Sequence, residues 1–279
     1  GLGLNSLVAW PVGALMAAAA AWVIGKIALG LREDYLAIAT LGIAEIIVTV
    51  LRNEDWLARG VKNLTGLPRP WPVPMEVDLQ LNPTFLEPVH AMGLDPVTAS
   101  TIFVKLLYAA MFGLVLMLLV WGCERALNSP WGRMVRAIRD NEISSAAMGK
   151  DVKFRHLQIF IIGSAVVGLA GAMMTSMEGQ LTPPSYLPLR FTFLIWVMVI
   201  VGGSGNNWGS ILGGLLIGWL YLAVEFLGPQ IMDHITSFLP AGDLKDHLQD
   251  TAAHMRLLTL GVVLLVVMRF APRGLIPEK

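Results

Sequence analysis

Long apolar runs, separated by shorter polar segments, dominate the pattern along the 279-residue chain. None of them alternates as a half-buried strand does, and a backbone in lipid must satisfy its own hydrogen bonds, so each run predicts a helix. Most approach the roughly 20 residues that a helix needs to cross a bilayer. We therefore predict an all-α, polytopic transmembrane helical bundle. The seven runs are Leu7–Leu29, Tyr35–Leu51, Thr101–Gly122, Leu157–Met177, Phe191–Gly203, Gly209–Leu227 and His254–Phe270. The fifth is short, which leaves a tilted helix, a broken helix and a fusion to its neighbour open.

The charges between the runs predict the orientation of the chain. Segment 228–253 carries one basic residue, Lys245, against four aspartates, whereas segment 123–156 carries seven basic residues. Because Lys and Arg are enriched in cytoplasmic loops, we predict that 123–156 is a cytoplasmic loop and 228–253 a periplasmic loop. Alternation then places 52–100 outside, the C-terminal tail inside and Gly1 outside. The seven basic residues are Arg125, Arg133, Arg136, Arg139, Lys150, Lys153 and Arg155.

The sequence also allows predictions about the start of the chain and about its outer loop. If the native N-terminus is cytoplasmic, an odd number of helices is missing before Gly1, so we expect a truncated or processed start. Loop 52–100 holds seven of the sixteen prolines, four of them within Leu67–Pro74. Such a density predicts an extended or irregular periplasmic loop, with a short helix near Asp55–Lys62. We expect residues 1–279 to form a single transmembrane domain.

Composition excludes several classes of function. The chain is 55% hydrophobic and 14% charged, whereas a soluble domain carries about 25% charged residues. Its zero net charge gives no reason to expect nucleic-acid binding. A single cysteine, Cys123, rules out an internal disulfide and disfavours a cysteine-type metal site. His247 and His254 are seven residues apart, but two histidines in an outer loop are more often solvated than bound to metal. We predict no metal and no cofactor.

The glycine-rich stretch GGSGNNWGS (Gly202–Ser210) is not a phosphate-binding loop, because it lacks the Gly-Lys-Ser/Thr that such a loop requires. We therefore predict no ATP hydrolysis and no catalytic residues in this chain. Gly205, Gly209 and Gly213 recur every four residues, so they share a helix face if the helix starts early. Small residues allow close approach of helices in lipid. Ordinary packing with a tight turn and a close-packed hairpin beside a translocation path are both compatible with the pattern.

Glu45 lies ten residues past Tyr35 inside an apolar run. An ionisable group at that depth is costly and usually faces protein or a water-filled cavity. One interpretation is a polar group beside a translocation path or gate, with Thr40 on the same helix. The other is a structural glutamate that is neutral or hydrogen-bonded to a neighbouring helix. The residues alone favour neither.

The stretch RAIRDNEISSAAMGKD (Arg136–Asp151) interrupts two apolar runs. Its bulky residues, Ile138, Ile143 and Met148, are five apart, so at about 100° per residue they point in three directions around a helix. This spacing disfavours a helix lying in the lipid headgroups. The other residues are small, which permits close approach, or charged, which gives register. They indicate a short cytoplasmic helix seated in a partner's cleft, with a solvated loop as the alternative.

Four stretches together resemble the LivM-type permeases of branched-chain amino acid ABC importers: GLREDYLAIATLGIAEI, GRMVRAIRDNEISSAAMGKDVKFRHLQIF, VGGSGNNWGSILGG and FAPRGLIPEK. The resemblance spans roughly Leu29 to Lys279. It implies a permease subunit of the bacterial inner membrane, paired with a LivH-like second permease, two ATP-binding subunits and a periplasmic binding protein. It also implies that the 123–156 loop couples to the ATPase through Asn141, Glu142, Ala146, Ala147 and Gly149.

Two departures from the family pattern bear on the solute. Such permeases usually carry earlier membrane helices with a glycine-rich segment, and the outer segment Leu67–Pro74 is atypical. Branched-chain amino acids are the expected solutes, and urea or short amides, which close relatives carry, are the alternative. A stand-alone secondary transporter or channel with Glu45 as an ion or proton relay is a different class of hypothesis. A membrane scaffold without transport is a third.

Overall fold

The computed structural model describes residues 5–31, 33–54, 56, 64–182, 188–237 and 255–277. It divides the chain into two compact units, residues 1–186 and 187–279. Whether the two form the expected single domain stays a prediction. Each of the seven apolar runs is a helix, as predicted. These helices are α1 (Ser6–Ala28), α2 (Glu33–Asn53), α6 (Pro96–Leu127), α9 (Val152–Glu178), α10 (Pro188–Gly202), α11 (Asn207–Ile235) and α13 (Met255–Phe270).

Within the described residues, five of these helices are long and apolar enough to cross a membrane: α1, α2, α6, α9 and α11. Helices α10 and α13 are shorter, at 15 and 16 residues. The fifth apolar run is a separate helix, because Gly203 and Gly205 adopt positive φ angles of 120° and 95° in the turn that follows it. The prediction of a polytopic helical membrane bundle is thus confirmed.

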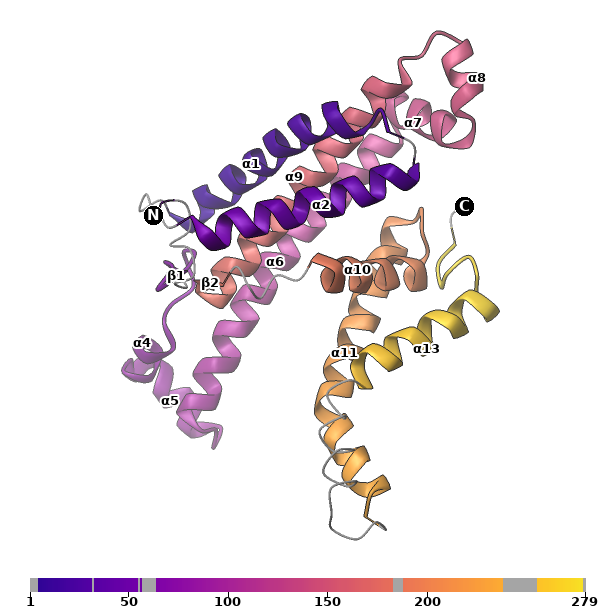
Figure 1. The fold of residues 1–279 in the computed structure, drawn as a ribbon. Coiled ribbons are helices and arrows are strands. Elements are labelled where there is room, and N and C mark those ends of the chain that lie inside the picture. Colours follow the sequence, from indigo (N-terminus) through magenta and orange to yellow (C-terminus); the bar gives the residue numbers. More distant parts are fainter. Residues whose placement is uncertain are drawn as a thin grey trace. The chain divides into compact units, whose positions relative to one another are not determined.

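In the first unit, α1 runs along α9 (Figure 1). The two helices approach closely because small residues face one another. A Cβ added to Gly168 would lie 3.0 Å from the carbonyl oxygen of Gly13, and one added to Gly13 would lie 3.1 Å from the Cβ of Ala172. At the outer end, Trp10 Nε1 donates a hydrogen bond of 2.9 Å to Ser176 Oγ. This pair of helices forms the centre of the unit.

The outer loop is more ordered than predicted. It contains the helices α4 (Glu76–Gln80) and α5 (Pro83–Ala91), and its strand β1 (Leu64–Thr65) pairs antiparallel with β2 (Gln180–Leu181). Residues 66–75, which hold four of the prolines, form no helix or strand, as predicted, whereas Pro83 and Pro96 occupy the first turns of α5 and α6, where a missing N–H costs nothing. The predicted helix near Asp55–Lys62 lies outside the described residues, apart from Trp56.

Segment 123–156, whose cytoplasmic location stays a prediction, contains two helices, α7 (Pro130–Asp140) and α8 (Glu142–Ala147). Figure 1 shows them at one end of α6 and α9, with α4, α5 and the paired strands at the other end. The described parts of 52–100 and 123–156 therefore lie at opposite ends of the first unit, which agrees with the predicted alternation; their sides of the membrane stay a prediction.

In the second unit, α10, α11 and α13 pack around Val197, Val201, Ile217 and Leu260. Helices α10 and α11 touch backbone to backbone, since a Cβ added to Gly209 would lie 2.7 Å from the carbonyl oxygen of Gly202. Gly213 likewise lies against the backbone of α10. Gly205 does not share this face, because α11 begins only at Asn207 and leaves Gly205 in the preceding turn.

The C-terminal tail folds back onto the turn after α10. The N–H groups of Leu275 and Ile276 donate hydrogen bonds of 2.9 Å to the carbonyls of Val201 and Gly202. Gly274, at a φ of 75°, permits this close approach. The tail therefore caps the carbonyls at the C-terminal end of α10, which would otherwise lack partners.

Candidate functional site

Helix α8 is a short helix with fixed ends. Asn141 separates α7 from α8 because its backbone is extended, with a φ of −155°. Its side chain accepts a hydrogen bond of 2.8 Å from Ser144 N. At the other end, Gly149 adopts a φ of 78° and donates a hydrogen bond of 2.9 Å to Ala146 O. A side chain at Gly149 would be strained by this backbone conformation. Asn141 and Gly149 thus set the limits of α8.

The predicted contact residues lie together on this helix and its caps. Asn141, Glu142, Ala146, Ala147 and Gly149 are all exposed. Ser145 is buried and faces the body of the unit. The structure therefore gathers all five predicted residues on a short helix that is open on its outer side. Their contact with an ATPase remains a prediction.

The stretch Arg136–Asp151 is not one continuous helix, as the predicted spacing of its three bulky residues required, because Asn141 divides it into two helices. Ile138 belongs to α7 and is 3% exposed, whereas Ile143 and Met148 belong to α8 and its cap and are 85% and 78% exposed. The sequence analysis did not name these two as candidate contact residues. The available signal was a bulky apolar residue in an otherwise small and polar stretch.

Helix α7 is also fastened to α9. Trp131 Nε1 donates a hydrogen bond of 3.3 Å to Gln158 Oε1, and Arg155 Nη1 donates one of 2.8 Å to the same oxygen. Asp151 caps α9 by accepting a hydrogen bond of 3.0 Å from Phe154 N. Helix α8 is therefore presented on a support that is connected to a membrane helix.

The two predicted path residues lie on α2. Thr40 Oγ1 donates to the carbonyls of Leu36 and Ala37 within its own helix, at 2.9 and 3.0 Å. Glu45 is exposed and has no hydrogen-bond or ion-pair partner in the described part of the chain. Its role in a path or gate stays a prediction, because the structure brings no second polar group to it.

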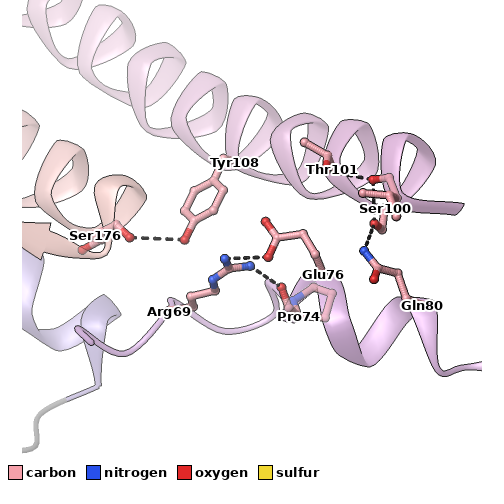
Figure 2. A network of polar contacts seen from close by, with 9 residues as sticks. Arg69, Pro74, Glu76, Gln80, Ser100, Thr101, Tyr108 and Ser176 are labelled. Atoms are coloured by element: carbon pink, nitrogen blue, oxygen red, sulfur yellow. Dashed lines mark hydrogen bonds and ion pairs between the residues drawn. The ribbon is translucent and has the colours of Figure 1, made fainter. Parts of the chain in front are cut away.

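Figure 2 shows polar contacts at this end of the first unit, and one of them, from Gln80 Nε2 of α4 to Ser100 Oγ of α6 at 2.9 Å, fastens the outer loop to a long helix. Arg69 Nη2 lies 2.7 Å from Glu76 Oε2, and Arg69 Nη1 donates a hydrogen bond of 2.9 Å to Pro74 O. Figure 2 also shows Tyr108 of α6 directed at the Ser176 carbonyl of α9, with a hydrogen bond of 3.3 Å. Partial burial raises the pKa of Glu76, but the Arg69 hydrogen bond and charge outweigh it and leave the pKa below its usual value.

No group of three or more metal-ligating side chains occurs among the described residues. Cys123 is free and exposed on α6. His247 and His254 lie outside the described residues.

Comparison with protein families decides what kind of membrane protein this is. A family model described as the permease component of branched-chain amino acid transport systems matches residues 1–268. The chain belongs to this permease family. The match begins earlier than the resemblance predicted, which started near Leu29. It ends at residue 268, so the stretch FAPRGLIPEK (Phe270–Lys279) lies wholly outside it.

The chain is also similar to curated permease proteins. The high-affinity branched-chain amino acid permease LivM of Escherichia coli K12 is 32% identical over 219 residues, which cover 77% of this chain and 50% of that protein. A probable LivM of Methanocaldococcus jannaschii is 31% identical over 156 residues, covering 56% and 42% of the two chains. The D-allose permease AlsC of Escherichia coli is 31% identical over 124 residues, covering 43% and 37%. No solved structure matches.

The chain thus spans about half the length of the LivM permease of Escherichia coli. Family membership confirms the predicted resemblance, and together with the long apolar helices it confirms a multi-pass membrane protein. In the described part of the chain, helix α8 combines fixed backbone ends with two exposed apolar side chains, Ile143 and Met148.

Proposed function

We propose that the chain is part of a permease subunit of an ABC importer that moves branched-chain amino acids inward across the bacterial cytoplasmic membrane. The partners are a second permease, two ATP-binding subunits and a periplasmic binding protein. The observation that carries this proposal is α8: a short, capped helix with exposed anchors on the side that the basic residues mark as cytoplasmic. The similarity to LivM permeases supports the solute class.

In this proposal α8 is seated in a cleft of an ATP-binding subunit. Ile143 and Met148 fill apolar pockets there, because side chains 85% and 78% exposed gain the most from burial. Ala146 and Ala147 allow the partner's backbone to come close. Glu142 supplies a charge that fixes register and steers encounter.

The energy comes from the partner. The chain carries no Gly-Lys-Ser/Thr sequence, so it lacks the residues with which a phosphate loop holds ATP. Hydrolysis in the ATP-binding subunits then drives the change between outward-open and inward-open states, and α8 is the contact through which it reaches the membrane helices.

A pull-down with matched variants tests this contact. We expect Glu142→Arg and Gly149→Trp to release the ATP-binding subunits from the complex in detergent. The control is Gly93→Trp. Gly93 follows α5 with a φ of 68°, close to the 78° of Gly149, and an added Cβ meets nothing within 4 Å at either glycine. Backbone strain is therefore similar in both variants, but Gly93 lies at the outer end. ATPase retained by Gly149→Trp at the wild-type ratio would refute the proposal.

The solute is tested by competition. We expect unlabelled leucine, isoleucine and valine to suppress uptake of labelled leucine, and urea and acetamide to leave it unchanged. Suppression by urea alone would assign the chain to the short-amide importers. Glu45, which has no polar partner among the described residues, is the feature that would serve an ion-driven transporter instead.

A further inference from the structure

The C-terminal end of α6 is capped by residues that come after it. The last carbonyls of a helix lack partners within the helix. Ser129 Oγ donates a hydrogen bond of 2.6 Å to Ala126 O, and Arg136 Nη2 donates one of 2.6 Å to Leu127 O. A cation is favourable there, because the helix dipole leaves partial negative charge at this end. Arg136, on α7, therefore binds the end of α6 through charge as well as geometry.

Gly132 makes this contact possible. It is buried in the first turn of α7, and a Cβ added to it would lie 2.5 Å from Ala126 O. Only glycine allows α7 to approach the backbone of α6 so closely. We refer to Ser129, Gly132 and Arg136 as the α6–α7 clasp.

The clasp joins two parts that must move together if α8 couples to transport. Helix α7 continues without a break from Gly132 to Asp140, and Asn141 N donates a hydrogen bond of 3.0 Å to Ala137 O where α8 begins. Ile138 anchors α7 by burial. A displacement of α8 is therefore passed along α7 to the clasp, and from there to α6, which spans 32 residues.

Two arginines of α7, Arg133 and Arg136, donate hydrogen bonds to carbonyls at the end of α6, and the bond of Arg136 is the shorter one. Arg133, one turn earlier on α7, is exposed and donates a hydrogen bond of 3.4 Å to Asn128 O. Arg136 is half-buried and its hydrogen bond is 2.6 Å long. Charge-assisted hydrogen bonds strengthen as they shorten and lose water, so Arg136 contributes more to the contact.

We propose that Arg136 is a positioning residue that holds α7 on the end of α6 and so transmits movement between the partner-bound α8 and the membrane. This inference rests on the proposed function. It assigns a role to a side chain that does not touch the partner or the solute.

The first test uses the complete transporter in proteoliposomes, with labelled leucine as the probe. We expect Arg136→Gln to keep its ATP-binding subunits and to hydrolyse ATP, while leucine transported per ATP falls about tenfold, the effect of losing one charge-assisted hydrogen bond. Arg136→Lys, which keeps a cationic donor, restores most of the ratio, and Arg133→Gln leaves it unchanged. An unchanged ratio in Arg136→Gln overturns the proposal.

The second test needs no transport. Spin labels on Cys123 of α6 and on Ile143→Cys of α8 report the distance across the clasp. We expect a narrow distribution with Arg136 and a broad one with Arg136→Gln, and an equally narrow one would overturn the proposal. If the unmodified complex shows no ATP-driven uptake, the proposed function fails, and the spin-label distances then decide only whether Arg136 holds α7 on the end of α6.

Discussion

The contact between α10 and α11 makes a quantitative prediction at Gly209. A Cβ at this position would lie 2.7 Å from Gly202 O and 3.0 Å from Gly203 O. The closest ordinary contacts between carbon and carbonyl oxygen are about 3.3 Å, so the two helices must separate by roughly 0.6 Å to admit a methyl group. The obstructing atoms are backbone atoms, which cannot turn aside as the end of a flexible side chain can. Overpacking of this kind costs about 1–3 kcal/mol.

Gly214 on the same helix provides the matched control, because a Cβ there meets nothing within 4 Å. Alanine favours a helix interior over glycine by about 1 kcal/mol, so most of this gain cancels between the two sites, although Gly209 lies in the first turn of α11. We expect Gly209→Ala to unfold with a free energy about 1–3 kcal/mol below that of Gly214→Ala. Unfolding in mixed micelles, titrated with dodecyl sulfate and followed by circular dichroism, measures both. Equal stability of the two variants would refute the close contact.

Three further predictions concern the rest of the chain. Glu45→Leu should insert normally but transport less leucine than the unmodified protein, because an apolar side chain removes the polar group of α2; equal uptake would leave Glu45 without a role in transport. The Arg69–Glu76 ion pair should hold the outer loop fully above pH 4.5, the ordinary pKa of glutamate, and lose its contribution as pH falls through the lower pKa in the folded protein. Hydrogen exchange of residues 64–82, corrected for its intrinsic pH dependence, checks this, and Glu76→Gln should abolish the change. Gly274→Ala should release the tail and speed tryptic cleavage after Arg273, because a Cβ there would lie 2.9 Å from Ile200 O; an unchanged cleavage rate would contradict the observed docking.

Hydrophobicity alone predicted all seven main helices, because a long apolar run in a membrane protein has few other stable conformations. The hydrophobic pattern predicted the first and last residues of these helices less accurately. Helix α6 begins at Pro96 and ends at Leu127, five residues beyond the predicted limits on either side. The cap residues Asp95 and Ser129, each followed by proline, carried that information.

The division of the cytoplasmic stretch depended on one residue. Asn141 ends α7 and caps α8, so the helical spacing of Ile138, Ile143 and Met148 had no meaning across it. Ile143 and Met148 therefore lie exposed on and next to α8, while Ile138 is buried on α7.

Contacts between distant segments could not be read from the sequence. The Arg69–Glu76 pair lies within the outer loop, but the hydrogen bond from Tyr108 to Ser176 joins residues that are 68 positions apart. Such pairings depend on how the helices pack, which a hydropathy pattern does not specify.

The energy source of transport tests the central claim most directly. The complex of this permease, its second permease, the ATP-binding subunits and the binding protein is reconstituted in proteoliposomes, and uptake of labelled leucine is measured with ATP alone and with a proton gradient alone. We expect uptake of labelled leucine when ATP is supplied on the membrane side where α8 lies, and no uptake with the proton gradient alone. Uptake driven by the gradient without ATP would contradict the assignment to an ABC importer.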